Sequence, residues 1–179
     1  GAAYVFVRSG SNWSEQQKLT ASDADAYDSF GGSVALDGDT AIIGALNDSH
    51  GGTDREGSAY VWVKSGGRWS EQQKLTASDA ADGDEFGGSV AFDGNRVVVG
   101  APESDQGGKT ETGAAYLYTR SGGNWSQLQK LTLSGAAAKD RFGWDVALLG
   151  KTVFVGADGD DYGGMTNAGS AFVYRLKDD

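Results

Sequence analysis

The sequence predicts an all-β protein built from propeller blades, each a small sheet of four antiparallel strands. Segments beginning Gly-x-Ala start at Gly1, Gly57, Gly113 and Gly169, which gives a repeat of 56 residues. Within each repeat, apolar residues alternate between glycine-marked turns with a period of two, which indicates strands and excludes helices. The inner strands are apolar on both faces, so each unit must be covered on two sides, as propeller blades are. A solenoid of four-stranded units is the competing architecture.

One repeat shows how each element is assigned. The four predicted strands of this repeat are 87–92, 96–101, 113–120 and 125–131. The dipeptide Asp93-Gly94 between the first two predicts a tight hairpin, because such turns need positive φ. The third strand has the pattern of a fully buried strand. The fourth is mostly polar and contains lysine, which suits an outer edge that must avoid stray pairing.

The blade boundaries follow from the repeat. Residues 1–20 supply a third and a fourth strand, 21–76 and 77–132 are two complete blades, and 133–179 is a blade without its outer strand. Rings typically need four to eight blades. Two explanations stay open: the chain is a segment of a longer array, or a second copy's N-terminus completes the last blade of the first. Two chains would then give six blades.

Composition limits the partners. The 179 residues carry a net charge of −10, so phosphates are repelled and neither nucleic acid nor an anionic membrane surface is expected as a partner. No apolar run approaches the ~20 residues of a membrane span, so no membrane insertion is expected. The absence of cysteine excludes disulfides and thiol chemistry.

Two landmarks carry a family resemblance. Phe86-Gly87 and Gly100-Ala101-Pro102 resemble the FG-GAP repeats of integrin α-subunit propellers. The fuller pattern KLTASD, FGGSVA, VVVGAP and GSAYVW is similar to the bacterial variety found in extracellular surface proteins. The resemblance implies an extracellular or cell-surface location and a binding role.

The calcium loop of integrin-type repeats, D-x-D-x-D-G-x-x-D, is not carried over. It lies between the first two strands, where this chain has only the stretches 36–39, 92–95 and 148–151. Each is too short to surround an ion that prefers six to eight oxygen ligands. These turns are therefore predicted to be hairpins.

The loops after the second and fourth strands are predicted to lie at one end of the blades and to form an acidic face. They hold 17 of the 25 acidic residues and four basic ones. Such a face attracts cations and basic partners. The predicted ligand-binding residues on it are Asp48, His50, Glu103, Asp105, Trp144, Asp160, Asp161 and Tyr162. Asp158, Asp160 and Asp161 form the best calcium candidate, although alone they offer too few ligands; no other cofactor is predicted.

Some single residues carry their own predictions. Asp28, Asp84 and Asp140 precede each Phe-Gly by two places and are expected to accept backbone N–H bonds in turns. Trp144 replaces a glycine at the start of an inner strand, where it either packs at the centre or offers a stacking surface to a sugar. His50, the only histidine, is interpreted as an exposed loop residue, because nothing else could complete a catalytic triad or zinc site with it.

The predicted function is a non-enzymatic extracellular binding or adhesion module that contacts protein or cation-bridged ligands through its acidic loops. A carbohydrate-binding lectin is one alternative, and a self-associating repeat of a surface layer or fibre is another. No nucleophile, base and oxyanion donor recur in a workable relation, so an enzyme is not predicted. The expected partners are a protein or glycan ligand and a second copy of the chain.

Overall fold

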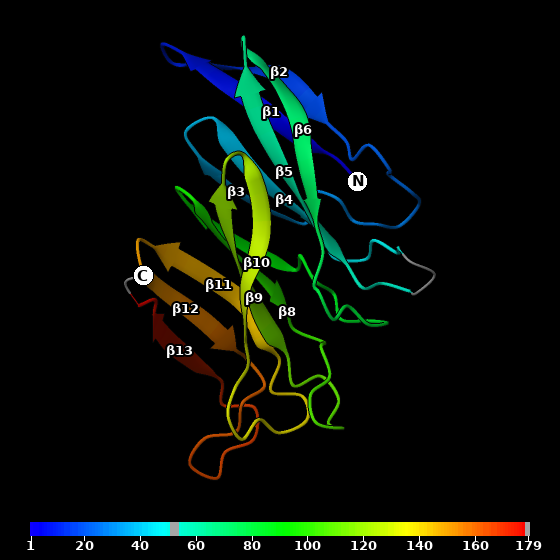
Figure 1. Ribbon diagram of the computed structural model, residues 1–179, viewed down its shortest axis with the longest axis vertical. Helices are drawn as coiled ribbons and strands as arrows, with labels where there is room; N and C mark the ends of the chain where they lie inside the picture. The colour runs from blue at the N-terminus through cyan, green and yellow to red at the C-terminus, as the bar shows by residue number, and fades with distance from the viewer. Residues whose placement is uncertain (51–53, 178–179) are drawn as a thin grey trace.

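The computed structural model describes residues 1–50 and 54–177 and shows four sheets in a row along the long axis (Figure 1). Within these residues there are thirteen strands and no helix, hence none that could cross a membrane. All neighbouring strands are antiparallel. The prediction of an all-β chain of propeller blades is confirmed, and the blades form an open row without ring closure.

The sheets differ in how many strands they contain. The N-terminal half blade pairs β1 (Ala3–Ser9) with β2 (Asn12–Leu19). The first blade is β3 (Ser33–Asp37), β4 (Thr40–Ala45), β5 (Ser58–Ser65) and β6 (Arg68–Leu75). The second blade is β7 (Ser89–Asp93), β8 (Arg96–Ala101), β9 (Ala114–Ser121) and β10 (Asn124–Leu131). The third blade is β11 (Phe142–Leu149), β12 (Thr152–Ala157) and β13 (Ser170–Arg175).

The strand ends differ slightly from the predictions. The inner strand of the second blade starts at Ser89 and not at residue 87, because Gly87 has a φ of 94° and turns the chain before the strand begins. The hairpin turn lies one residue later than predicted, at Gly94-Asn95, since Asp93 is paired with Arg96. Gly94 supplies the positive φ that the turn requires, at 60°.

The hydrophobic core lies between blades, in three clusters that each join two neighbouring sheets. The phenylalanine of each Phe-Gly corner is central to its cluster. Phe86 is fully buried and lies edge-on to Tyr116, with ring centroids 5.4 Å apart. Removing such a ring typically costs about 3–5 kcal/mol. Because each cluster combines residues of two sheets, a blade buries its apolar faces only against a neighbouring blade.

Polar contacts recur between neighbouring sheets. The Gln73 amide donates to the carbonyl of Trp125 and accepts from its N–H, both at 2.8 Å, and Gln17 makes the same pair with Trp69. The Ser89 hydroxyl donates to the carbonyl of Gly143. These contacts join the backbone of one sheet to side chains of the next.

Glycine is required where two blades touch most closely. A Cβ at Gly44 would lie 2.0 Å from the carbonyl oxygen of Gly87, and a Cβ at Gly100 would lie equally close to that of Gly143. The Gly-Ala landmark therefore exists to accept the Phe-Gly backbone of the following blade.

Candidate functional site

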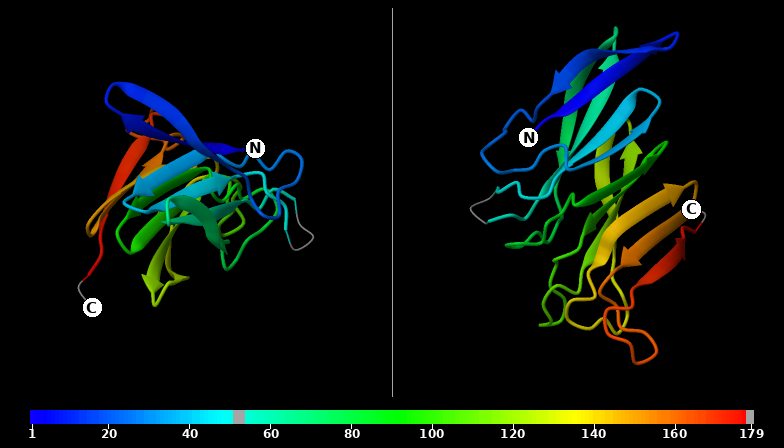
Figure 2. Two further views of the ribbon diagram at one scale, coloured as in Figure 1. Left: turned by 90° about the horizontal axis from the view of Figure 1, so that it is seen from above. Right: turned by 180° about the vertical axis from the view of Figure 1, so that it is seen from behind.

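The longer loops lie along one side of the row and the tight hairpins along the opposite side (Figure 2). This arrangement follows from the antiparallel order of strands, which puts the loops after the second and fourth strands at the same end. The loop side therefore collects most of the acidic residues. Their burial and partners decide what this surface can do.

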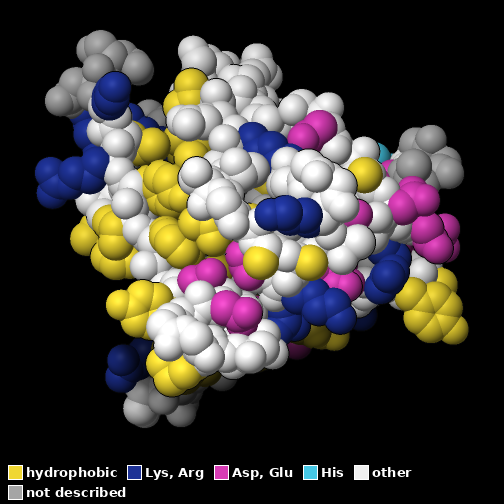
Figure 3. Space-filling model, turned by 90° about the horizontal axis from the view of Figure 1, so that it is seen from below, with side chains coloured by type: hydrophobic (Ala, Val, Ile, Leu, Met, Phe, Trp, Pro, Cys, Tyr) yellow, Lys and Arg dark blue, Asp and Glu magenta, His cyan; other side chains and the backbone are white. Residues whose placement is uncertain are grey.

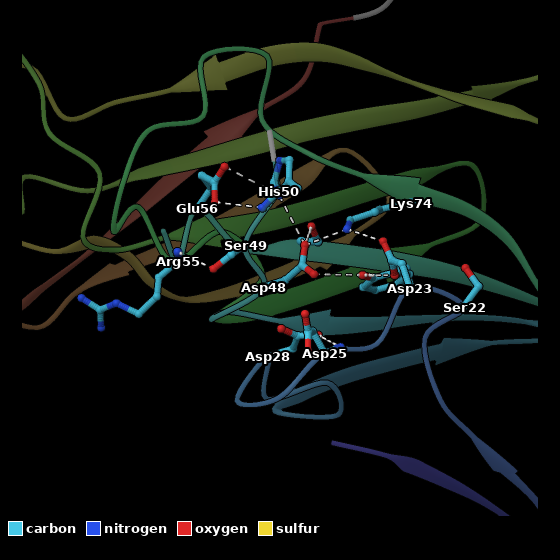
Figure 4. Close-up of polar contacts among 12 residues, drawn as sticks. Ser22, Asp23, Asp25, Asp28, Asp48, Ser49, His50, Arg55, Glu56 and Lys74 are labelled. Carbon is cyan, nitrogen blue, oxygen red and sulfur yellow. Dashed lines mark hydrogen bonds and ion pairs between the residues drawn. The ribbon is translucent and has the colours of Figure 1, made fainter. Parts of the chain in front are cut away.

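In the first blade, several loop carboxylates belong to a network around Lys74 (Figure 4). The Lys74 ammonium lies 2.6 Å from Asp23 and 2.7 Å from Asp48. Asp48, whose side chain is only 3% exposed, also accepts a hydrogen bond from the Ser58 hydroxyl. The Tyr60 hydroxyl donates to Asp23 at 2.8 Å. The network holds two loops against the sheet.

The titration behaviour reflects this network. Burial opposes ionisation of Asp23, but hydrogen bonds from Lys74 and Tyr60 outweigh it and hold the pKa of Asp23 below its usual value. Burial and the nearby carboxylates raise the pKa of the Tyr60 hydroxyl far above its ordinary value. Burial also opposes the charge on Lys74, yet its two carboxylate partners raise its pKa. Asp23 and Lys74 therefore stay charged at neutral pH, and the Tyr60 hydroxyl stays protonated.

The second blade repeats part of this network. Lys130 lies 2.6 Å from Asp79, which also accepts a hydrogen bond from the Tyr116 hydroxyl. Ser104 stands where the first blade has Asp48. In the third blade Phe172 replaces the tyrosine. Lysines from β6 and β10 therefore neutralise part of the acidic loops, which a count restricted to loop residues misses.

The three corner aspartates behave as predicted. Asp28, Asp84 and Asp140 are all buried, and each accepts the backbone N–H of the residue three places earlier. Burial raises the pKa of Asp84, partly offset by the N–H of Ala81. These carboxylates shape the loops.

His50 is half-buried, which corrects the expectation of an exposed residue. Its Nδ1 lies 3.3 Å from a carboxylate oxygen of Asp48 and 4.0 Å from one of Glu56. Its backbone N–H donates to Glu56, which is itself buried. Two of the loop acids thus face inward here, so the surface they leave is less negative than the sequence count suggests.

The other predicted ligand-binding residues lie nearer the surface. Asp105 and Asp161 are exposed, and their carboxylates accept the N–H of Glu111 and Asn167. Glu103 is half-buried, and burial together with the charges of Glu111 and Glu85 raises its pKa. Asp160 is half-buried and Tyr162 is exposed. Their role in binding stays a prediction.

The predicted calcium residues are partly engaged by protein groups. The Arg141 guanidinium donates to Asp158 at 2.9 Å, so this carboxylate already has a cationic partner. Among residues 1–50 and 54–177, no group of three or more histidine or acidic side chains is arranged to hold a metal ion. Calcium binding stays untested.

A hollow lies where the three inner strands begin. It has a volume of about 500 Å³ and is lined by Gly32, Ser33, Val34, Gly88, Ser89, Val90, Trp144 and Asp145. The Trp144 side chain is 48% exposed, with the Arg141 guanidinium 4.7 Å from its ring centroid. Trp144 is expected from the sequence either to pack at the centre or to offer a stacking surface. Its ring is accessible beside the hollow. We call this hollow the central hollow.

Sequence reasoning singled out Trp144 and missed the residues around it. Asp145 replaces the serine found at Ser33 and Ser89, and that break in the repeat was a usable signal. The network of Lys74 and Lys130 could also have been found, because both lysines and their partners Asp23 and Asp79 recur at the 56-residue spacing.

Comparison with known proteins supports one family. The family model described as FG-GAP repeat matches residues 13–62, 69–118 and 125–174. Each match runs from the fourth strand of one sheet to the third strand of the next. No curated protein matches the chain. Propeller-like modules of this type generally bind and do not catalyse. The three tandem matches span most of the sequence, so the chain belongs to the FG-GAP repeat family.

Proposed function

We propose that this chain is a non-enzymatic binding module, acting outside the cell, that holds a protein ligand with basic residues against its loop side. The observation that carries the proposal is the central hollow with its exposed Trp144 ring. Exposed aromatic residues that can be covered by a partner are typical anchors of protein interfaces. Tyr27, Tyr162 and Met165 are further exposed apolar side chains in loops that precede an inner strand or follow a second strand.

The charge around these anchors favours a basic ligand. Asp25, Asp54, Asp82, Asp105 and Asp161 are exposed loop acids that lie outside the ion pairs found among the described residues. Charges at the rim of an interface steer association more than they add affinity. The extracellular location rests on the resemblance to bacterial surface proteins. The proposal needs no bound ion, since Asp158 is held by Arg141.

The test is selection from a phage-displayed library of random peptides. Peptides that bind the loop side are expected to be rich in Lys and Arg and to bind less as NaCl rises, because salt screens exposed charges. Trp144→Ala should abolish binding, and EDTA should not affect it. Leu128→Ala is the control, since Leu128 is also an exposed apolar residue but lies on the outer strand β10 and away from the central hollow.

Two results would contradict the proposal. Selected peptides whose binding is insensitive to Trp144→Ala would place the site elsewhere. Salt-resistant binding on a glycan array that Trp144→Ala removes would instead support the lectin alternative, in which Trp144 and Asp145 hold a sugar.

A further inference from the structure

The N-terminal half blade leaves one side of the first blade uncovered. Inner-strand residues Val34 and Leu36 are 64% and 67% exposed, whereas their counterparts Val146 and Leu148 in the third blade are buried and half-buried. A groove of about 390 Å³ lies there, lined by residues of β1, β3 and β4 together with Leu19 and Trp69. The groove occupies the place that the first and second strands of a blade would fill.

The third blade leaves its outward side uncovered at the other end of the row. Phe154, Val173 and Leu149 are large exposed apolar residues there, and apolar side chains gather on the face seen from this end (Figure 3). A Cβ at Gly156 would meet no atom nearer than 3.6 Å, whereas Gly44 and Gly100 are pressed against the next blade. Gly156 therefore keeps the clearance for a following blade.

The polar contacts between blades are also split between the two ends. Gln129 is exposed and is the counterpart of Gln17 and Gln73, which hold the backbone of a tryptophan in the next outer strand. Trp13 is such a tryptophan, and no side chain of the described residues makes this contact with it. Each end therefore has one half of the same contact.

Two more pairs show the same division. Ser22 and Ser78 bind Glu71 and Gln127 of the next outer strand. At the two ends of the chain, the corresponding residues are Ser134 and Glu15. Lys74 pairs with Asp48 within the first blade. The equivalent lysine of the N-terminal half blade is Lys18, and the equivalent aspartate of the third blade is Asp160, so each end holds one charge of this ion pair.

From these observations we propose that a second copy of this chain completes the third blade. Its β1 and β2 take the third and fourth places beside β11 and β12, and β13 gives way to β1. The two strands repeat each other, with Ala3-Tyr4-Val5 in place of Ala171-Phe172-Val173. Val155, now opposite Phe172, would pair with Tyr4 of the second copy. In the blade that the two copies share, β11 and β12 of one copy fill the groove beside β1 of the other and cover its Val34 and Leu36.

The completed pair closes into a ring of six blades. Each chain contributes two full blades and two halves, and six lies within the four to eight blades of known rings. A head-to-tail contact of this kind is closed only if the rotation between copies completes a circle. The contact between copies would have the same geometry as the contacts between blades within one chain, because the same residue positions meet in both.

The experiment measures mass in solution by light scattering at rising protein concentration, after incubation that allows strand exchange. The expected mass is about twice the 18.6 kDa of one chain. Gly156→Ala should remain a monomer with an unchanged melting temperature, because the added methyl is tolerated within one chain and blocks only the incoming backbone. Leu36→Asp should also remain a folded monomer, since Leu36 is exposed there.

Mixing the two variants shows whether each fails to dimerise because its interface is blocked or because the chain is unfolded. Gly156→Ala keeps an intact groove and Leu36→Asp keeps an intact third blade, so the mixture should form dimers that neither variant forms alone. A wild-type chain that stays at 18.6 kDa at millimolar concentration would overturn the proposal. A Gly156→Ala variant that dimerises like the wild type would do the same. The readout needs no ligand, so it is independent of the proposed binding function.

Discussion

Two lysines at equivalent positions on β6 and β10 have different partners. Lys74 lies between Asp23 and the buried Asp48, whereas Lys130 has Asp79, with a half-exposed side chain, as its one ion-pair partner among the described residues. Removing one partner of a buried pair leaves an uncompensated charge, while an exposed pair contributes about 1 kcal/mol or less. We expect Lys74→Met to lower the free energy of unfolding by about 2–3 kcal/mol and Lys130→Met by about 1 kcal/mol or less. Urea unfolding of both variants checks this, and equal losses would contradict it.

Two aspartates should respond to pH with opposite signs. The pKa of Asp23 is lowered in the folded state, so Asp23 stabilises the fold above its unfolded value of 3.8 and loses that contribution as pH falls below it. The pKa of Asp84 is raised by burial, so its charge disfavours folding at neutral pH and this effect disappears on acidification.

Stability against urea at pH 7 and pH 3 tests this difference. Asp23→Asn should lose stability at pH 7 and lie closer to the wild type at pH 3. Asp84→Asn should be as stable as the wild type or slightly more stable at pH 7. A loss at pH 7 in Asp84→Asn as large as that in Asp23→Asn would show that the pKa difference is not expressed in stability.

The contacts between outer strands offer a matched pair at the level of elements. Gln73 makes two hydrogen bonds to the backbone of Trp125 across a blade interface, and its counterpart Gln129 is exposed at the open end. Each such bond contributes about 0.5–1.5 kcal/mol. Gln73→Ala is therefore expected to lower the free energy of unfolding by about 1–2 kcal/mol. Gln129→Ala should leave the free energy of unfolding of the monomer unchanged. Thermal unfolding at low protein concentration measures both.

Strands and loops differ in how far the sequence could predict them. The alternation in residues such as 59–63 specifies a buried third strand, and the polar run of 69–75 specifies an outer one, because these patterns depend on faces within one sheet. The burial of Asp48 and Glu56 could not be read in this way. It depends on which side chains from β6 and the neighbouring loop approach them, and a single loop sequence does not encode that.

At the scale of the whole molecule, stability depends on how many neighbours a blade has. The second blade is buried on both faces, since β8 and β9 contribute to two of the three apolar clusters. The half blade and the third blade each contribute to one. In repeat proteins, stability is roughly a sum over units and nearest-neighbour interfaces. The row should therefore be most stable at its middle.

Amide hydrogen exchange can measure this gradient and connect it with self-association. Protection should be greatest in β8 and β9, where residues 97–101 and 114–118 are all buried, and least in β2 and β13, which have exposed edges and faces. If a second copy completes the third blade, protection of β1, β11 and β12 should rise with protein concentration while that of β8 and β9 stays constant. β13 should lose protection over the same range, because β1 replaces it beside β12. If protection of β13 instead rose with protein concentration together with that of β12, strand exchange would be contradicted. A uniform protection profile along the row would contradict the dependence of stability on the number of neighbours.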